Sequence, residues 1–135
     1  MAEVSKGLRE RPMSPHLQVW RWHITMATSI LHRATGVALY VGALIAAAWA
    51  LSLAGGPEAY AGFKALMGSP LGKFVLFGLT VSAFYHLGNG VRHLTWDLGH
   101  GLDVKSANAS AVGVFAFTVA ATLAVWVIAG MTGAL

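Results

Sequence analysis

Long apolar stretches separated by short polar ones dominate the chain, and three of the apolar stretches contain no Asp, Glu, Lys or Arg. The first covers the 24 residues between Arg33 and Glu58, the second the 18 residues between Lys73 and Arg92, and the third the 30 residues after Lys105. A helix that crosses a bilayer needs about 20 mostly apolar residues. These runs do not alternate as membrane β-strands would, so we predict an all-α integral membrane protein with three transmembrane helices.

The three predicted spans belong to a single transmembrane domain over residues 23–135. They cover about 24–53, 71–94 and 107–130. Residues 1–22 are predicted to be a cytoplasmic N-terminal arm, in which Pro12 and Pro15 oppose helix formation. Gly55, Gly56, Pro57 and Pro70 indicate a short external loop over residues 55–70.

The positions of Lys and Arg predict how the spans are oriented. Only Lys64 and Lys73 lie on one side, and seven lie on the other: Lys6, Arg9, Arg11, Arg21, Arg33, Arg92 and Lys105. The positive-inside rule therefore places the N-terminus in the cytoplasm and the C-terminus in the periplasm. The first residues are too polar for a cleavable signal peptide and do not resemble a transit sequence. We thus favour a bacterial inner membrane over the mitochondrial inner membrane.

Composition supports membrane residence and excludes several kinds of chemistry. The chain is 56% hydrophobic and 10% charged, against about 25% charged residues in soluble domains. It has no cysteine, which excludes disulfides, iron–sulfur ligation by this chain and thioether attachment of haem. Phosphate loops, catalytic triads and paired carboxylates are absent from the sequence, so we expect no complete active site in this chain alone.

The motif FYHLGNGVRHLTWD, residues 84–97, places a histidine deep in the second span. His86 lies six residues before Arg92, roughly 9 Å inside that boundary, and an ionisable residue at such depth indicates a function. His86 could ligate a metal or haem iron, relay protons, or pack as a neutral residue bonded across helices. Gly88 and Gly90 beside it leave room for a flat group or another helix, and His93 shares its face nearer the water.

Counting histidines constrains any haem that two histidines ligate. The third span contains no histidine, and His32 lies near the interface. His86 is therefore the single deeply placed candidate, and on this hypothesis a second ligand has to come from another chain.

A second cluster, SILHRATG, occupies residues 29–36 at the inner end of the first span. Ser29 and Arg33 are four residues apart and point the same way. An arginine fork suits a carboxylate, such as a haem propionate, or a polar ring substituent, and a hydroxyl can donate to a carbonyl oxygen. The alternative is that Arg33 only extends to the interface and that His32 and His93 are interfacial residues without a ligand.

Taken together, RPMSPHLQVW (11–20), SILHRATGVAL (29–39) and YHLGNGVRHLTWDLGHG (85–101) resemble the cytochrome b membrane-anchor subunit of succinate dehydrogenase, respiratory complex II. The resemblance runs from Arg11 to the end of the chain. It implies three transmembrane helices that pair with a second small anchor, bind one haem b between the two, and hold the iron–sulfur and flavoprotein subunits on the membrane. It also implies that electrons from succinate, a substrate of the tricarboxylic acid cycle, pass by electron transport through flavin and iron–sulfur clusters to ubiquinone.

The same resemblance assigns roles to particular residues. His86 corresponds to the axial haem ligand, and the partner anchor supplies the other ligand. Ser29 and Arg33 correspond to the quinone-site serine and arginine, and His32 to the histidine beside the haem propionates. Two further residues match positions near the haem edge or quinone pocket: His93 and Asp97.

Three other functions are weighed against this one. A quinol:fumarate reductase subunit would run the same chemistry in reverse. A haem-free structural anchor would leave His86 unexplained. An unrelated transporter or proton channel predicts acidic residues inside the spans, and the three charge-free stretches have none.

Overall fold

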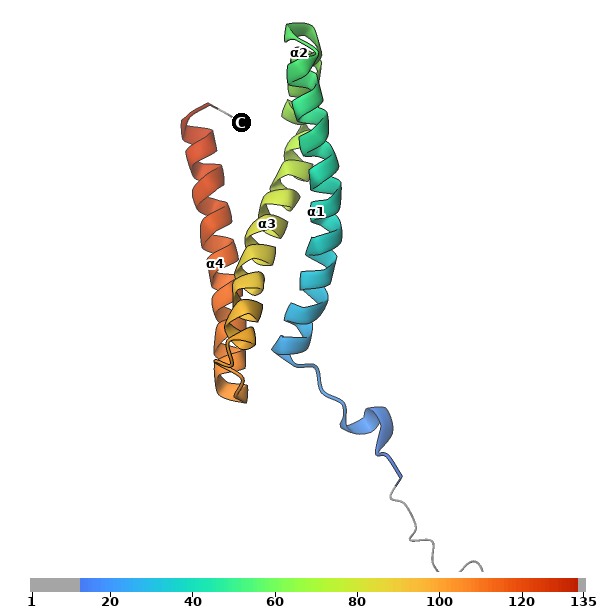
Figure 1. The fold of residues 1–135 in the computed structure, drawn as a ribbon, viewed down its shortest axis with the longest axis vertical. Helices are drawn as coiled ribbons and strands as arrows, with labels where there is room; N and C mark the ends of the chain where they lie inside the picture. Colours follow the sequence, from blue (N-terminus) through green and yellow to red (C-terminus); the bar gives the residue numbers. More distant parts are fainter. Residues whose placement is uncertain (1–12, 134–135) are drawn as a thin grey trace, which may run out of the picture.

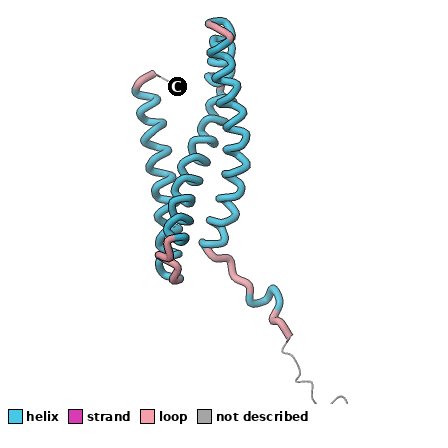
Figure 2. The backbone as a smooth tube through the Cα atoms, viewed as in Figure 1, coloured by secondary structure: helices cyan, strands magenta, loops and turns pink. Residues whose placement is uncertain are grey.

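The computed structural model describes residues 13–133, which form four α-helices after a single turn of 3-10 helix. The elements are η1 (His16–Val19), α1 (Ile24–Ala54), α2 (Pro57–Gly68), α3 (Pro70–Asp97) and α4 (Val104–Met131). Figure 1 shows the three long helices running lengthwise, with α2 at one end and the N-terminal segment leaving from the other. Residues 13–133 contain no strand (Figure 2), which confirms the predicted all-α class.

Three of these helices are long and apolar enough to cross a membrane. Helix α1 has 31 residues, and α3 and α4 have 28 each. At about 1.5 Å per residue, 28 residues extend about 42 Å, more than the roughly 30 Å hydrocarbon core. The prediction of three spans is confirmed, and α3 contacts both α1 and α4. The predicted arm, residues 1–22, stays a prediction, because residues 1–12, with Lys6, Arg9 and Arg11, lie outside the described residues.

Burial in the bundle is inverted relative to a soluble protein. The buried polar side chains include Thr28, Asn89 and Arg92, whereas large apolar side chains such as Leu44, Phe74 and Leu123 are exposed. Within a bilayer the exposed apolar residues face lipid, and polar residues find partners between helices. Thr80 and Ser82 instead bond carbonyl oxygens one turn back, Leu76 at 2.7 Å and Gly78 at 2.8 Å.

The prediction of a loop over residues 55–70 is wrong in one respect, because this segment contains helix α2. Its glycine and proline residues mark helix boundaries and do not form a continuous loop. Gly56 adopts φ 92°, a conformation that favours glycine, and Pro57 occupies the first turn, where proline is tolerated. Ser69 then caps α3 by accepting a 3.1 Å hydrogen bond from the Gly72 N–H, with Pro70 in the first turn.

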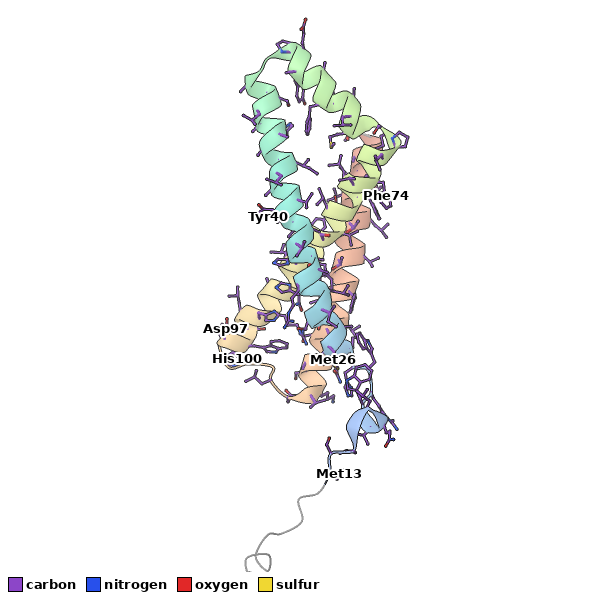
Figure 3. The ribbon with its side chains drawn as sticks, turned by 90° about the vertical axis from the view of Figure 1, so that its right-hand side faces the viewer. Met13, Met26, Tyr40, Phe74, Asp97 and His100 are labelled. Atoms are coloured by element: carbon purple, nitrogen blue, oxygen red, sulfur yellow. The ribbon has the colours of Figure 1, made fainter. Side chains whose placement is uncertain are left out.

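The connection between α3 and α4 is a tight turn that fixes the end of the bundle nearest the N-terminal segment. Gly99 and Gly101 adopt φ 78° and 71°, and the Trp96 indole donates a 3.1 Å hydrogen bond to the Gly101 carbonyl. Asp103 caps α4 by accepting a 2.9 Å hydrogen bond from the Ser106 N–H. Hydrogen bonds from the backbone and side chain of Ser106 lower the pKa of Asp103. Figure 3 shows Asp97 and His100 at this end, where α1 begins near Met26.

Candidate functional site

Three histidines from two helices stack into a column near the end of the bundle where α1 begins and α3 ends. The ring of His32 on α1 lies 3.9 Å from that of His86 on α3, centroid to centroid, with an interplanar angle of 15°. On α3, the ring of His93 lies 5.1 Å from His32, at 20°. His32 and His86 are half-buried, and His93 is exposed. The structure thus brings together three site residues that the sequence predicted, 54 to 61 positions apart between the helices.

The His86 ring lies against two consecutive residues of α1, Thr35 and Gly36. Thr35 Oγ1 lies 3.2 Å from His86 Nδ1. A Cβ atom on Gly36 would stand 3.3 Å from His86 Cε1, so α1 passes close against the ring. The other ring nitrogen, Nε2, makes no hydrogen bond to any residue in 13–133. This nitrogen is therefore available to a ligand.

Of the two glycines expected to leave room for a flat group or another helix, Gly88 makes room for another helix. A Cβ on Gly88 would meet Phe117 of α4 at 3.1 Å, and one on Gly90 would meet nothing within 4 Å. Gly88 therefore lets α4 approach, whereas the glycine in contact with His86 is Gly36 of the other motif.

The histidine column lacks the geometry of a proton relay or of a site for a bare metal ion. The hydrogen bonds of His86 and His93 go to Thr35 and to the Asn89 carbonyl, at 3.2 and 2.7 Å, and none joins one histidine to another within the described chain. The nitrogens of stacked rings also lie in nearly parallel planes, so they do not converge on a single metal ion. Residues 13–133 contain no cluster of three or more potential ligand residues that could hold a metal ion.

His32 contributes an unpartnered polar atom at the centre of the column. Its Nδ1 is buried and has no hydrogen-bond partner among residues 13–133. Buried polar atoms are nearly always hydrogen-bonded in native proteins. An orphaned ring nitrogen between two other imidazoles therefore indicates a polar ligand at this position.

Ser29 and Arg33 occupy the exposed face of α1 beside the column. Both side chains are exposed, and neither is hydrogen-bonded to a residue in the described part of the chain. They are one turn apart and share a face, as predicted. Asp97, at the end of α3, is likewise exposed and has no ion pair within 13–133. These groups are available to a ligand or to another subunit.

Arg92, by contrast, is a structural arginine that ties three helices together. It is 5% exposed. Its guanidinium lies 4.0 Å from the Trp96 ring centroid and makes four hydrogen bonds: to Ser110 Oγ (2.9 Å), Thr28 Oγ1 (3.2 Å), Asn89 Oδ1 (3.3 Å) and the Ala107 carbonyl (2.9 Å). The charge is thus dispersed over polar groups of α1, α3 and α4. Four of its five N–H donors are used, so Arg92 is not available to a ligand, in contrast to Arg33.

Sequence reasoning missed this polar network, although the sequence carries a signal for it. Ser82, Tyr85, Asn89 and Arg92 recur at spacings of three, four and three, which places them on one face of a helix. All four are buried, and the Tyr85 hydroxyl donates a 3.0 Å hydrogen bond to the Thr28 carbonyl. A polar stripe in an apolar helix predicts the buried face, which here fixes the register of α3 against α1 and hence the histidine column.

Comparison with known proteins gives a consistent result over most of the chain. The family model of the succinate dehydrogenase/fumarate reductase transmembrane subunit matches residues 7–125. A succinate dehydrogenase cytochrome b556 subunit from Paracoccus denitrificans is 39% identical over 119 residues, or 88% of this chain and 90% of the relative. One from Rickettsia felis is 38% identical over 118 residues, or 87% and 92%. The mitochondrial cytochrome b560 subunit from Sus scrofa is 42% identical over 111 residues, or 81% and 66%.

The chain therefore belongs to the family of succinate dehydrogenase/fumarate reductase transmembrane subunits. It is a multi-pass membrane protein similar to the cytochrome b556 and b560 subunits of succinate dehydrogenase. The match covers nearly all of the two bacterial relatives but just under two thirds of the mitochondrial one. The family resemblance predicted from the sequence motifs is confirmed.

Proposed function

We propose that this chain is a membrane-anchor subunit of succinate dehydrogenase that contributes a haem b ligand and part of the ubiquinone-reduction site. The observation that supports the proposal is the hydrogen bonding of the two ring nitrogens of His86. Its Nδ1 is held by Thr35 inside the membrane span while its Nε2 is free of hydrogen bonds to the described chain. Metal-bound histidines commonly have this arrangement, with the second ring nitrogen hydrogen-bonded to the protein.

The residues of the histidine column fit a haem b group. His86 would bind the iron through Nε2, and His32, whose buried Nδ1 lacks a partner, would donate a hydrogen bond to a propionate. We assign His93 and Asp97 to the haem edge or quinone pocket, since His93 stacks on His32 and Asp97 follows one turn later. When bound, haem b supplies a one-electron redox centre.

A second axial ligand has to come from another subunit. Helix α4 contains no histidine, the His32 ring is stacked on that of His86, and the His93 ring is stacked on that of His32. The proposal therefore includes a second small membrane anchor that completes the haem site. The iron–sulfur and flavoprotein subunits would dock at the same end, from which the basic N-terminal segment leaves the membrane.

Ser29 and Arg33 are suited to quinone reduction. Reduction adds negative charge to the quinone carbonyl oxygens before protons arrive, and hydrogen-bond donors aimed at those oxygens stabilise it. The Ser29 hydroxyl and the Arg33 guanidinium are two such donors on one exposed helix face. We propose succinate oxidation, not fumarate reduction, as the physiological direction, because the relatives from Paracoccus denitrificans and Sus scrofa are succinate dehydrogenase subunits. The proposed location is a bacterial inner membrane, with the N-terminus in the cytoplasm.

Purification of the affinity-tagged chain from its native membranes in mild detergent tests this assembly. A flavoprotein, an iron–sulfur protein and a second small membrane chain are expected to co-elute with the tagged chain and to carry succinate:quinone reductase activity. Elution of the tagged chain without a flavoprotein and an iron–sulfur protein, under conditions that preserve that activity in the membranes, would contradict the proposal.

A further inference from the structure

We infer that Thr35 is a positioning residue for haem: together with Gly36 it fixes the tautomer and placement of His86, and thereby lowers the redox potential of the bound haem. This inference rests on the proposed function, because it assumes that His86 binds the iron. It concerns a residue of α1 that contacts the ligand residue and not the haem itself.

The hydrogen-bond network around Thr35 determines which ring nitrogen of His86 carries the proton. Thr35 Oγ1 lies 2.8 Å from the Leu31 carbonyl oxygen, 3.0 Å from that of His32 and 3.2 Å from His86 Nδ1. The hydroxyl has a single proton, and carbonyl oxygens only accept. The proton therefore goes to a backbone carbonyl, and the hydroxyl oxygen accepts from the Nδ1–H of His86. Nε2 of His86 would then carry the lone pair that is available to the haem iron.

Gly36 and His32 hold the same ring by contact. The Cβ that any other residue would place at Gly36 would stand 3.3 Å from His86 Cε1 and 3.9 Å from Nδ1, while the His32 ring stacks at 3.9 Å. Three residues within two turns of α1 thus constrain a ring that belongs to α3. A ring held in this way presents Nε2 in one orientation.

The Thr35 hydrogen bond has a consequence for the haem potential. Donation from Nδ1–H to an acceptor makes the imidazole more basic and a stronger electron donor through Nε2. Greater electron donation stabilises ferric over ferrous iron, so it lowers the reduction potential. Loss of the acceptor should therefore shift the potential in the positive direction.

Optical redox titration of haem b in the purified complex tests the inference with Thr35→Val and Thr35→Ser. Valine keeps the shape of threonine and removes the hydroxyl, whereas serine keeps the hydroxyl. Thr35→Val is expected to shift the midpoint potential positively or to lose haem, with Thr35→Ser matching the wild type. A Thr35→Val potential equal to that of the wild type, or an equal shift in both variants, would overturn the inference. A wild-type complex without a b-type spectrum would instead count against the proposed function.

A different observation supports a second site, at the opposite end of the bundle. A pocket of about 460 Å³ lies between the end of α1, helix α2 and the start of α3, and its lining includes Trp49, Tyr60, Phe63, Lys64, Lys73 and Leu76. It thus combines two cationic side chains with an aromatic and aliphatic wall. Helix α2, which lines this pocket, lies at the end of the bundle opposite the N-terminal segment (Figure 1). The pocket shares no residue with the proposed haem and quinone sites.

The two lysines of this pocket have no carboxylate partner among residues 13–133. They are the only Lys or Arg residues between Arg33 and Arg92. The Lys64 ammonium lies 5.7 Å from the Tyr60 ring centroid. Glu58, the one acidic residue of this region, is six positions before Lys64 and therefore about 120° away around α2. The pocket thus carries a net positive charge that the described chain does not neutralise.

We propose that this pocket binds the phosphate of an anionic phospholipid, with an acyl chain along Trp49, Phe63 and Leu76. A ligand with an anionic head and an apolar body matches both halves of the lining. The site lies where membrane-spanning helices end, at the level where aromatic side chains meet lipid headgroups. Basic pockets between transmembrane helices bind such headgroups on the cytoplasmic side of membranes. At this opposite end of the bundle, α2 provides the wall that makes a basic pocket of the same kind.

Native mass spectrometry of the delipidated complex, titrated with phosphatidylglycerol, tests the lipid site. The double variant Lys64→Gln/Lys73→Gln is expected to bind about 30-fold more weakly, at about one kcal/mol per lysine, whereas Lys105→Gln should bind like the wild type. Equal binding by the double variant would refute the site. If inorganic phosphate competed as effectively as phosphatidylglycerol, the site would be one for free anions. If phosphatidylcholine bound with equal affinity, the site would be purely apolar. Either result would overturn the proposal.

Discussion

The variant Arg33→Gln is expected to lower succinate-dependent quinone reduction by about 100-fold while leaving dye reduction by the soluble subunits intact. Removing one hydrogen-bond donor that stabilises developing negative charge costs about 10²–10³ in rate, and the exposed position of Arg33 favours the lower end of that range. Artificial dyes accept electrons upstream of the quinone, so they bypass this side chain. Quinone reductase and dye reductase rates measured on the same membranes give the comparison.

A matched control for Arg33→Gln is Arg21→Gln. Arg21 is also exposed and lies before the start of α1, so its replacement removes the same charge away from the site. It should leave both rates near the wild-type values. Quinone reduction by Arg33→Gln at the wild-type rate would remove Arg33 from the quinone site. A parallel loss of dye reduction would show impaired assembly instead.

Loss of haem b from an otherwise assembled complex is expected for His86→Ala. The imidazole is half-buried and makes one side-chain hydrogen bond, to Thr35, so its removal leaves the Arg92 network and the contacts of α3 with α4 in place. Without this imidazole the haem iron would lack the axial ligand that we assign to this chain, and no other residue of the column occupies the position of His86. The haem-to-flavin ratio of the purified complex, with subunit content read from a gel, should fall several-fold.

The control for His86→Ala is His100→Ala, which alters an exposed histidine in the connection between α3 and α4. It should retain the wild-type haem content. Full haem occupancy in His86→Ala with an unchanged spectrum would mean that the axial ligand lies elsewhere.

The architecture could be predicted from the sequence because membrane spans leave a local signature. Each charge-free stretch is long enough to cross a bilayer, and the three long helices coincide with those stretches. Helix α2 was missed because Gly56, Pro57 and Pro70 are residues that occur both in loops and at helix ends. Only the backbone conformation, such as φ 92° at Gly56, distinguishes the two.

The candidate site could be predicted only in part. The depth of His86 indicated a function but by itself left a packing role open. Its contacts with Thr35 and His32 depend on the register between α1 and α3, which joins residues more than 50 positions apart. That register depends on the buried contacts of Tyr85 and Arg92 with Thr28. The polar stripe of α3 predicts the buried face of that helix but not its partner residue on α1.

The ligand count explains why this chain alone does not complete its proposed site. One deeply placed histidine would provide one axial ligand, and the exposed face of Ser29 and Arg33 would leave one side of a bound quinone open. Both features are expected of a subunit whose remaining site residues belong to its neighbours. The polar interior and apolar exterior of residues 13–133 are likewise suited to a helical bundle that packs against further transmembrane helices.

The central claim is that this chain binds haem b in a complex that oxidises succinate. A reduced-minus-oxidised visible spectrum of the purified wild-type complex tests it most directly, with succinate as the first reductant and dithionite as the second. The account predicts a b-type band with dithionite and its partial or complete appearance with succinate. The absence of a b-type band with either reductant, in a complex that still reduces quinone with succinate, would contradict the account.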